Sequence, residues 1–125
     1  MDRDVKSYDA KLRMIGVVEK AGEVSEIRIF PEYCEGLTAI GDYEKIMILF
    51  WMHLRNNEED RSRLMNSRPR HGKEGKRGVF ASHSSHRPNP IGVTVVELVS
   101  VEECRLIVKG FDAFEETPII YIKSA

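Results

Sequence analysis

Residues 44–53 read Glu-Lys-Ile-Met-Ile-Leu-Phe-Trp-Met-His and contain the longest apolar run of the chain. The run extends without interruption from Ile46 to Met52, with charged side chains before it and a histidine after it. A short continuous apolar run is typical of a strand that is buried on both faces. We therefore expect residues 44–53 to form the central strand of the core.

Five further segments have the apolar or alternating pattern of short strands, namely residues 12–18, 24–30, 91–99, 105–108 and 118–122. Pro31 introduces residues 32–40, whose apolar side chains have helical spacing, and this predicts one short helix. Residues 54–76 contain few apolar side chains and predict a long basic loop, while residues 101–103 predict a turn. These elements predict a mostly β fold, a small closed or partly open β-barrel with one short helix and a long basic loop.

The length of 125 residues is that of one ordinary domain, and we expect a single domain over residues 1–125. Apolar residues make up 42% of the chain and charged residues 31%, which suffices for both a core and a solvated surface. The longest apolar run is too short to cross a bilayer, and no basic segment followed by an apolar one opens the sequence. We therefore expect a cytoplasmic protein that makes no membrane contact.

The two cysteines, Cys34 and Cys104, lie far apart in the sequence. Neither belongs to a CxxC pair or to another metal-binding spacing. We interpret both as small buried apolar residues in a reducing cytoplasm, in preference to a disulfide or a nucleophile.

The segment from Arg61 to Arg77 is basic and holds a single acidic residue, Glu74. The net charge of the whole chain is −1, so any attraction for nucleic acid must come from such a local patch. The segment predicts contacts with a phosphate backbone that carry no sequence information. The alternative is a solvated loop, because no aromatic side chain for base stacking is interleaved with the charges.

The loop from Ser82 to Gly92 contains Pro88 and Pro90, which restrict the backbone on both sides of Asn89. Arg87 offers a planar guanidinium for a carboxylate or phosphate, and Asn89 offers an amide for a purine edge. From the residues alone, a rigid turn in which Asn89 caps its own backbone is an equally good interpretation.

Histidines do not predict a metal site, although the chain has four of them, at positions 53, 71, 83 and 86. His83 and His86 have the spacing of a helical pair, but the adjoining Pro-Asn-Pro sequence prevents a helix there. A metal-dependent hydrolase is therefore the weakest of the functions considered. The glycines match neither the phosphate-loop nor the dinucleotide fingerprint, which argues against a Rossmann-type enzyme.

Residues 78–92 read Gly-Val-Phe-Ala-Ser-His-Ser-Ser-His-Arg-Pro-Asn-Pro-Ile-Gly. This run resembles the signature of the TsaA-like family, which is usually Gly-Val-Phe-Ala-Thr-Arg-Ser-Pro-His-Arg-Pro-Asn-Pro-Ile-Gly. Further stretches agree in order, so that the resemblance covers nearly the whole chain. They are Ile15–Val18, Gly36-Leu37 through the apolar strand to His53, Phe111-Asp112, Thr117-Pro118 and Ile122-Lys123.

The resemblance implies a β-barrel, typically a homodimer, that binds S-adenosylmethionine between the subunits or near their junction. It also implies a methyltransferase acting on the exocyclic nitrogen of threonylcarbamoyladenosine in tRNA. The alternative is a non-catalytic S-adenosylmethionine-binding protein, or a methyltransferase of another small substrate. Methyl transfer to such a nitrogen depends mainly on in-line orientation and on the loss of one proton.

Positions matched to the family imply cofactor contacts at Met52, His53, His83, Val93, Gly110, Phe111 and Asp112. Arg87 and Asn89 match the core of the signature and are expected to shape the pocket and bind substrate. Asp112 is the carboxylate expected to meet a hydroxyl, an amine or a proton, or else it is only a turn residue. The chain departs from the family pattern at His83, Ser85, Glu115-Glu116 and Tyr121, and it lacks the early Ser-Pro-Tyr and Pro-Arg-Gln elements.

Overall fold

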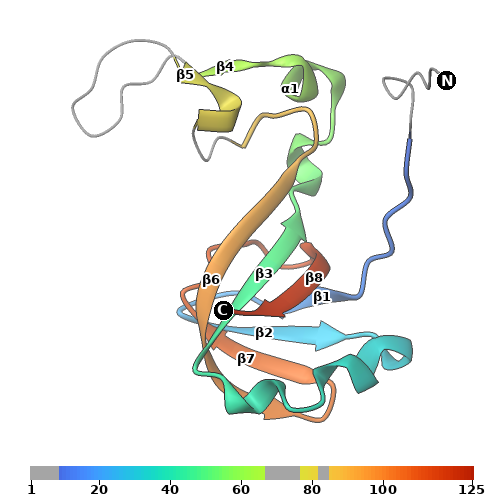
Figure 1. Ribbon diagram of the computed structural model, residues 1–125, viewed down its shortest axis with the longest axis vertical. Helices are drawn as coiled ribbons and strands as arrows, with labels where there is room; N and C mark the ends of the chain where they lie inside the picture. Colours follow the sequence, from blue (N-terminus) through green and yellow to red (C-terminus); the bar gives the residue numbers. More distant parts are fainter. Residues whose placement is uncertain (1–8, 67–76, 82–84) are drawn as a thin grey trace, which may run out of the picture.

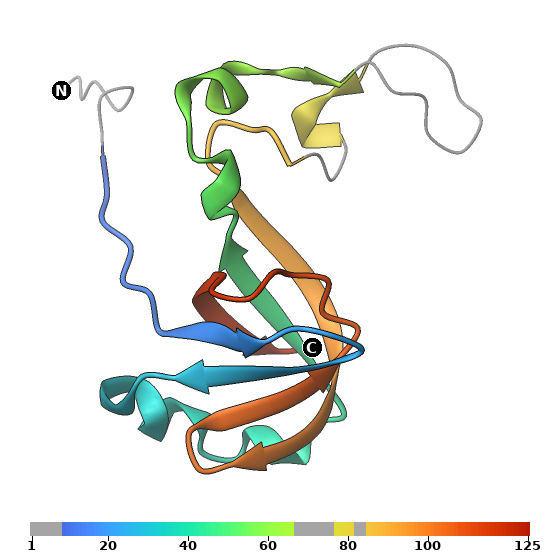
Figure 2. The same cartoon turned by 180° about the vertical axis from the view of Figure 1, so that it is seen from behind.

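A six-stranded closed barrel forms the body of the protein (Figures 1 and 2). The computed structural model describes residues 9–66, 77–81 and 85–125. Neighbouring strands follow the order β1-β2-β7-β6-β3-β8 and pair antiparallel throughout. The strands are β1 (Gly16–Lys20), β2 (Val24–Ile29), β3 (Lys45–Trp51), β6 (Ile91–Glu102), β7 (Arg105–Lys109) and β8 (Pro118–Ser124). The prediction of a mostly β barrel is confirmed, and closure removes the unpaired edges that an open sheet would expose.

The core fills the inside of this barrel with side chains from alternate positions of the strands. Ile27, Ile46, Ile48, Leu106 and Ile119 are completely buried and come from four of the six strands. Alternation places their neighbours in sequence on the outer face. The barrel interior is therefore an apolar core without a channel, and any ligand site must lie at its ends or outside it.

β3 is central, as predicted, but only one of its faces is fully buried. Ile46 and Ile48 are inaccessible, whereas Met47 and Leu49, which alternate with them, are half-buried. A barrel wall is one layer thick, so its outer face stays apolar and partly exposed unless something covers it. The expectation of burial on both faces was therefore wrong for this chain.

The segment after β2 forms two short 3₁₀ turns, η2 (Pro31–Leu37) and η3 (Ile40–Asp42), where we predicted one helix over residues 32–40. The break falls at Ala39, whose φ of 66° is left-handed and incompatible with a continuous helix. Tyr33, Leu37 and Ile40 still pack against the core, so the apolar spacing was informative about burial.

Cys34 and Cys104 form a disulfide, which corrects the prediction of two unpaired thiols. Cys34 lies in η2 and Cys104 in the turn between β6 and β7, and their Cα atoms are 5.3 Å apart. The Cys104 carbonyl also accepts a hydrogen bond from the Ile29 amide (2.8 Å), which brings this turn beside the start of η2. The argument for a reducing compartment from two free cysteines is therefore removed.

A small lobe is inserted between β3 and β6, at the end of the barrel where Trp51 pairs with Ile91 (Figure 1). Its described elements are η4 (His53–Arg55), α1 (Glu58–Ser62), β4 (Met65–Asn66), β5 (Arg77–Gly78) and η5 (Val79–Ala81). The prediction of an unbroken loop over residues 54–76 was thus wrong for residues 54–66, and its remaining part, residues 67–76, lies outside the described residues. Asn57 starts α1 by accepting a hydrogen bond from the Asp60 amide, a capping signal that was present in the sequence.

Two boundaries also differ from the prediction. β1 begins at Gly16 rather than at residue 12, and β6 continues to Glu102 before a tight turn at Glu103 and Cys104. Glu103 has a φ of 60°, as such turns require.

In the part of the chain that the structure describes, no helix has the length and apolarity needed to span a membrane.

Candidate functional site

A cavity of about 590 Å³ lies where the barrel meets the lobe. Its lining comes from the end of β3, from η4 and from the loop between β7 and β8. The lining residues are Phe50, Met52, His53, Leu54, Arg55, Ser85, Asp112, Ala113, Phe114 and Thr117. The volume is within the range of pockets that hold small molecules and cofactors.

The β3 side of the cavity is held by backbone and aromatic contacts. The Met52 amide donates to the Pro90 carbonyl (2.7 Å), which fixes the exit of β3 against the entrance of β6. The Phe50 ring meets Phe111 edge-on, with ring centroids 5.3 Å apart. These contacts give the cavity one rigid apolar wall.

The loop after β7 forms another part of the cavity wall and is tied down at both ends. Gly110 adopts a φ of 87°, a conformation that favours glycine, and Phe111 is 4% exposed in the core. Thr117 is buried, and its carbonyl accepts a hydrogen bond from the Val18 amide (3.0 Å). Between these anchors the Asp112 side chain is exposed and lines the cavity.

Arg55 carries the positive charge on the lobe side of the cavity. Its Nη1 lies 3.7 Å from Oδ1 of Asp60, which belongs to α1 and is largely buried. The other oxygen of Asp60 accepts a hydrogen bond from the Asn57 amide side chain (2.7 Å). The cavity therefore combines apolar walls with one guanidinium, one carboxylate and the His53 imidazole, a composition suited to a polar ligand with an apolar body.

Three of the residues expected from the sequence, Met52, His53 and Asp112, are brought together in this cavity although 59 positions separate the last two. Gly110 and Phe111 do not line it; they support the loop that carries Asp112. Their expected contacts with a cofactor stay a prediction.

Two other expected residues lie elsewhere. Val93 sits on the outer face of β6, opposite Leu49, and is 46% exposed. It does not line the cavity of this single chain, and its contact with a cofactor stays a prediction. His83 lies outside the described residues.

Arg87 and Asn89, expected to bind substrate, lie at a second and smaller cavity of about 240 Å³ together with Phe80, Pro88 and Ile91. Nη2 of Arg87 donates to the Val79 carbonyl (2.5 Å), so at least one arm of the guanidinium holds the loop in place. Asn89 and Phe80 are exposed, with 81% of Phe80 accessible to solvent. The rigid-turn interpretation and the substrate-binding interpretation are compatible, because a fixed loop presents exposed side chains in one orientation.

Several lining residues were not expected from the sequence, above all Arg55, Phe114 and Thr117. Arg55 lies only two residues after His53, but its place in a basic segment suggested a solvated side chain. Thr117 belongs to a matched stretch of the family, so its position was available as a signal. Phe114 had no signal, since nothing in a polar loop indicates which side chain turns toward a cavity.

The residues that the structure describes contain no group of three histidine, cysteine, aspartate or glutamate side chains arranged to hold a metal ion.

The sequence of residues 16–124 matches the family model of the tRNA-methyltransferase O N-terminal domain, in agreement with the resemblance found in residues 78–92. An S-adenosyl-L-methionine-binding protein of Archaeoglobus fulgidus is 44% identical over 100 residues, covering 80% of this chain and 68% of that protein. A protein of Methanocaldococcus jannaschii, named a probable S-adenosyl-L-methionine-binding protein, is 36% identical over 113 residues, covering 90% of this chain and 89% of that protein.

Among solved structures, the fold is similar to that of TrmO from Pseudomonas aeruginosa, with a TM-score of 0.71 and 24% sequence identity. That similarity covers 94% of this chain but only 55% of the other chain. The likeness therefore concerns the fold of the barrel, and this chain spans little more than half the length of the solved protein.

Proposed function

The chain belongs to the family of the tRNA-methyltransferase O N-terminal domain, and from this membership we propose that it is an S-adenosylmethionine-dependent methyltransferase. More specifically, we propose that it methylates the exocyclic nitrogen of threonylcarbamoyladenosine in tRNA. The cofactor assignment is supported by two relatives whose names describe S-adenosyl-L-methionine-binding proteins.

The observation that carries this proposal is the convergence of Met52, His53 and Asp112 on one cavity. These are positions at which the family resemblance implies cofactor contacts. The cavity volume of about 590 Å³ and its apolar walls fit a nucleoside with a side chain attached through a sulfonium centre. Phe50, Met52 and Phe114 would contact the apolar parts, and His53, Arg55 and Asp112 the polar ones.

When bound, S-adenosylmethionine supplies a methyl group on a sulfonium centre, which an acceptor nitrogen can take with release of one proton. The contribution of the chain is to hold the acceptor in line and to exclude water, which accounts for much of the acceleration of such reactions. His53 lines the cavity half-buried, and its imidazole offers a hydrogen-bonding group beside the bound reactants.

Charge distribution supports a nucleic-acid substrate. Residues 52–91, which include the lobe, contain nine lysines and arginines and four acidic residues, whereas the rest of the chain is strongly acidic. Of the basic segment from Arg61 to Arg77, the described part ends at residue 66 and resumes at Arg77. We propose that this side of the protein contacts the tRNA backbone. We also propose that the protein acts in the cytoplasm.

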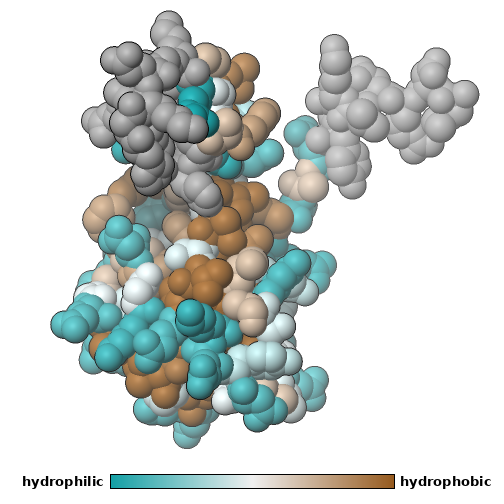
Figure 3. Space-filling model, turned by 60° about the vertical axis from the view of Figure 1, so that its left-hand side comes forward, coloured by the Kyte–Doolittle hydropathy of each residue, from teal (hydrophilic) through white to brown (hydrophobic). Residues whose placement is uncertain are grey.

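The outer face of β3, β6 and β8 supports a homodimer. The outer apolar face, as we call it, consists of Met47, Leu49, Val93, Val95, Val99 and Tyr121, and four of these side chains are between 46% and 52% exposed. Hydrophobic residues gather in a band on this side of the molecule (Figure 3). Apolar patches of this kind on soluble proteins are usually covered by a partner, and we propose a second copy. Val93 would then lie at the junction of two subunits.

The proposal is tested by calorimetric titration with S-adenosylmethionine, followed by a methyl-transfer assay on the same sample. Two tRNA preparations serve as acceptors, one containing threonylcarbamoyladenosine and one prepared from cells unable to make it. We expect binding in the micromolar range and methyl transfer to the first preparation alone.

Other outcomes separate the alternatives. Binding without transfer to either tRNA would favour a non-catalytic cofactor-binding protein or a different small substrate. Transfer to both preparations would contradict the proposed acceptor but not the enzyme class. Absence of binding at millimolar cofactor would overturn the function as a whole.

A further inference from the structure

The cavity carries opposite charges on its two walls. Arg55 projects from η4 on the lobe side, and Asp112 from the loop after β7 on the barrel side. The other lining side chains are apolar or neutral, apart from His53. A ligand that fills this cavity therefore meets a cation at one point and an anion at another.

Arg55 is held in position by a small polar cluster. Asp60 is 8% exposed and makes two hydrogen bonds with Asn57. The Asp60 amide donates to Asn57 Oδ1 (2.8 Å), and the Asp60 carboxylate accepts from Asn57 Nδ2 (2.7 Å). The remaining carboxylate oxygen of Asp60 faces Arg55 at 3.7 Å. A guanidinium has five N–H donors, so the ion pair with Asp60 attracts Arg55 to this side of the cavity and leaves donors for a ligand.

Asp112 is positioned by the backbone on either side of it. Phe111, buried beside Phe50, fixes the loop immediately before it, and Gly110 turns the chain away from β7. Among the described residues, no cation forms an ion pair with the Asp112 carboxylate. An exposed carboxylate at a cavity wall without a protein partner is available to a cationic ligand group.

We propose that Arg55 and Asp112 recognise the two charged groups of an α-amino acid moiety, Arg55 its carboxylate and Asp112 its ammonium group. This inference rests on the proposed function, in which the amino acid moiety is the methionine end of S-adenosylmethionine. Asp60 acts on Arg55 as a positioning residue. The apolar walls then face the uncharged nucleoside end. The His53 imidazole is left free of the amino acid moiety and would contact the methyl acceptor.

The test compares two thioethers that differ only in the amino acid moiety. S-adenosylhomocysteine carries the carboxylate and the ammonium group, whereas 5′-methylthioadenosine lacks both. Calorimetry on the intact protein should show at least tenfold tighter binding of S-adenosylhomocysteine. In Arg55→Gln and in Asp112→Asn, that preference should fall about tenfold while the affinity for 5′-methylthioadenosine is unchanged.

Two further variants complete the design. Arg63→Gln is the matched control, because Arg63 is an exposed arginine of the same segment that does not line the cavity; it should bind both ligands as the parent protein does. Asp60→Asn should lower the preference by a smaller factor, and binding of 5′-methylthioadenosine reports that the cavity is still folded.

Several results would overturn the inference. If the parent protein binds S-adenosylmethionine but Arg55→Gln keeps the full preference, the assignment of the carboxylate fails while the proposed function stands. An equal loss of affinity for both thioethers in Arg55→Gln would show that Arg55 only supports the fold. A raised KM for tRNA with unchanged cofactor affinity would assign the Arg55 site to a carboxylate of the acceptor. Failure of the parent protein to bind any of the three ligands would instead overturn the proposed function.

Discussion

Gly92 and Phe50 face each other across the β3–β6 pair, and only a glycine leaves room for the aromatic ring. A Cβ atom at position 92 would overlap the ring of Phe50, which lines the cavity and contacts Phe111. This explains in physical terms why a glycine closes the signature of residues 78–92.

Gly92→Ala is expected to displace Phe50 and to lower the free energy of unfolding by about 1–3 kcal/mol, the usual effect of overpacking. Cofactor affinity should fall as well, because the apolar wall moves. Urea unfolding and calorimetry measure the two effects. Gly36→Ala, where an added Cβ meets no atom within 4 Å, is the control and should change neither. Equal stability of the two variants would contradict this account.

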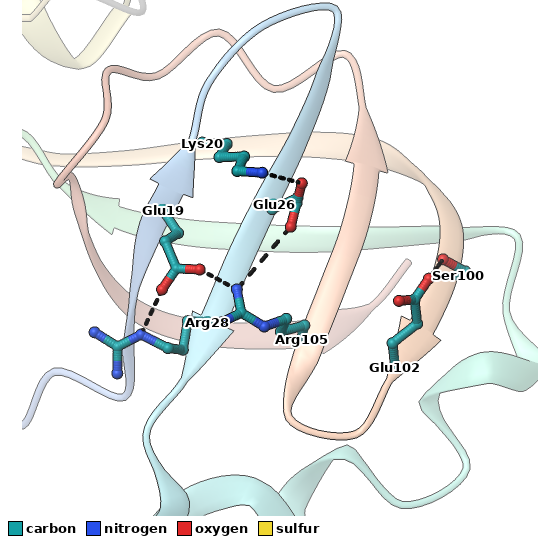
Figure 4. A network of polar contacts seen from close by, with 7 residues as sticks. All are labelled: Glu19, Lys20, Glu26, Arg28, Ser100, Glu102 and Arg105. Atoms are coloured by element: carbon teal, nitrogen blue, oxygen red, sulfur yellow. Dashed lines mark hydrogen bonds and ion pairs between the residues drawn. The ribbon is translucent and has the colours of Figure 1, made fainter.

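An ion-pair network covers the outer face of β1, β2 and β7 (Figure 4). Glu19 accepts hydrogen bonds from Arg105 and from Nε of Arg28 (2.8 Å), and Glu26 pairs with Lys20 (3.6 Å) and Arg105 (4.0 Å). The hydrogen bond from Arg105, with a second from Arg28, holds the pKa of Glu19 below its ordinary value of 4.5. Isolated surface pairs contribute little, but a network of several charges does more.

A depressed pKa in the folded state means that the Glu19 contribution to stability is complete above the pH at which an unfolded carboxyl titrates. It is lost as the pH falls through the lower pKa of the folded state. Glu19→Gln should therefore be less stable than the parent protein at pH 7, with a difference that shrinks at pH 3. Urea unfolding at both pH values measures this, with Glu32→Gln, at an exposed carboxylate, as the control. A difference that does not depend on pH would contradict the prediction.

At the scale of elements, the disulfide joins η2 to the β6–β7 turn across 70 positions of sequence. Spacing alone could not reveal this pair, because each cysteine lies in a connection whose place is set by the barrel. Closing so long a loop reduces the entropy of the unfolded chain, and such bonds typically stabilise a protein by about 2–4 kcal/mol.

The double variant Cys34→Ser/Cys104→Ser is expected to lose stability of that order, and a reducing agent should destabilise the parent protein by a similar amount. Thermal unfolding with and without reductant measures the effect. The double variant is also its own control, since reductant should not change it. Two alkylated cysteines in the mass spectrum of the unreduced denatured protein would show that the bond is absent.

The helix of the lobe is a second element that sequence pattern could not predict. Asn57 and the acidic residues after it are an ordinary helix start, yet the five residues of α1 are too few for an apolar periodicity to appear. Its stability depends on the burial of Asp60 and on the Arg61 guanidinium, which lies 5.9 Å from the centroid of Trp51. Short elements of this kind are decided by packing rather than by propensity.

At the scale of the whole molecule, the outer apolar face predicts the assembly state. The parent protein should have about twice the chain mass of 14.3 kDa in sedimentation or light-scattering measurements. Val95→Asp, which puts a charge in the middle of the face, should shift it to the monomer by weakening association at least tenfold. Val24→Asp, at an exposed valine on β2, is the matched control and should stay dimeric. A monomeric parent protein would overturn the proposed dimer.

Local pattern was sufficient to specify six strands, their approximate limits, the barrel and the family, because alternation of apolar residues and a stiff proline-rich signature are properties of neighbouring residues. Met52, His53 and Asp112 were singled out as candidates by the resemblance to the family, through their matched positions. Only the tertiary structure decided that Cys34 meets Cys104, that Arg55 and Asp112 face one cavity, and that Val93 points outward. These are contacts between residues far apart in the chain, and they exist only once closure of the barrel has set the geometry of its loops.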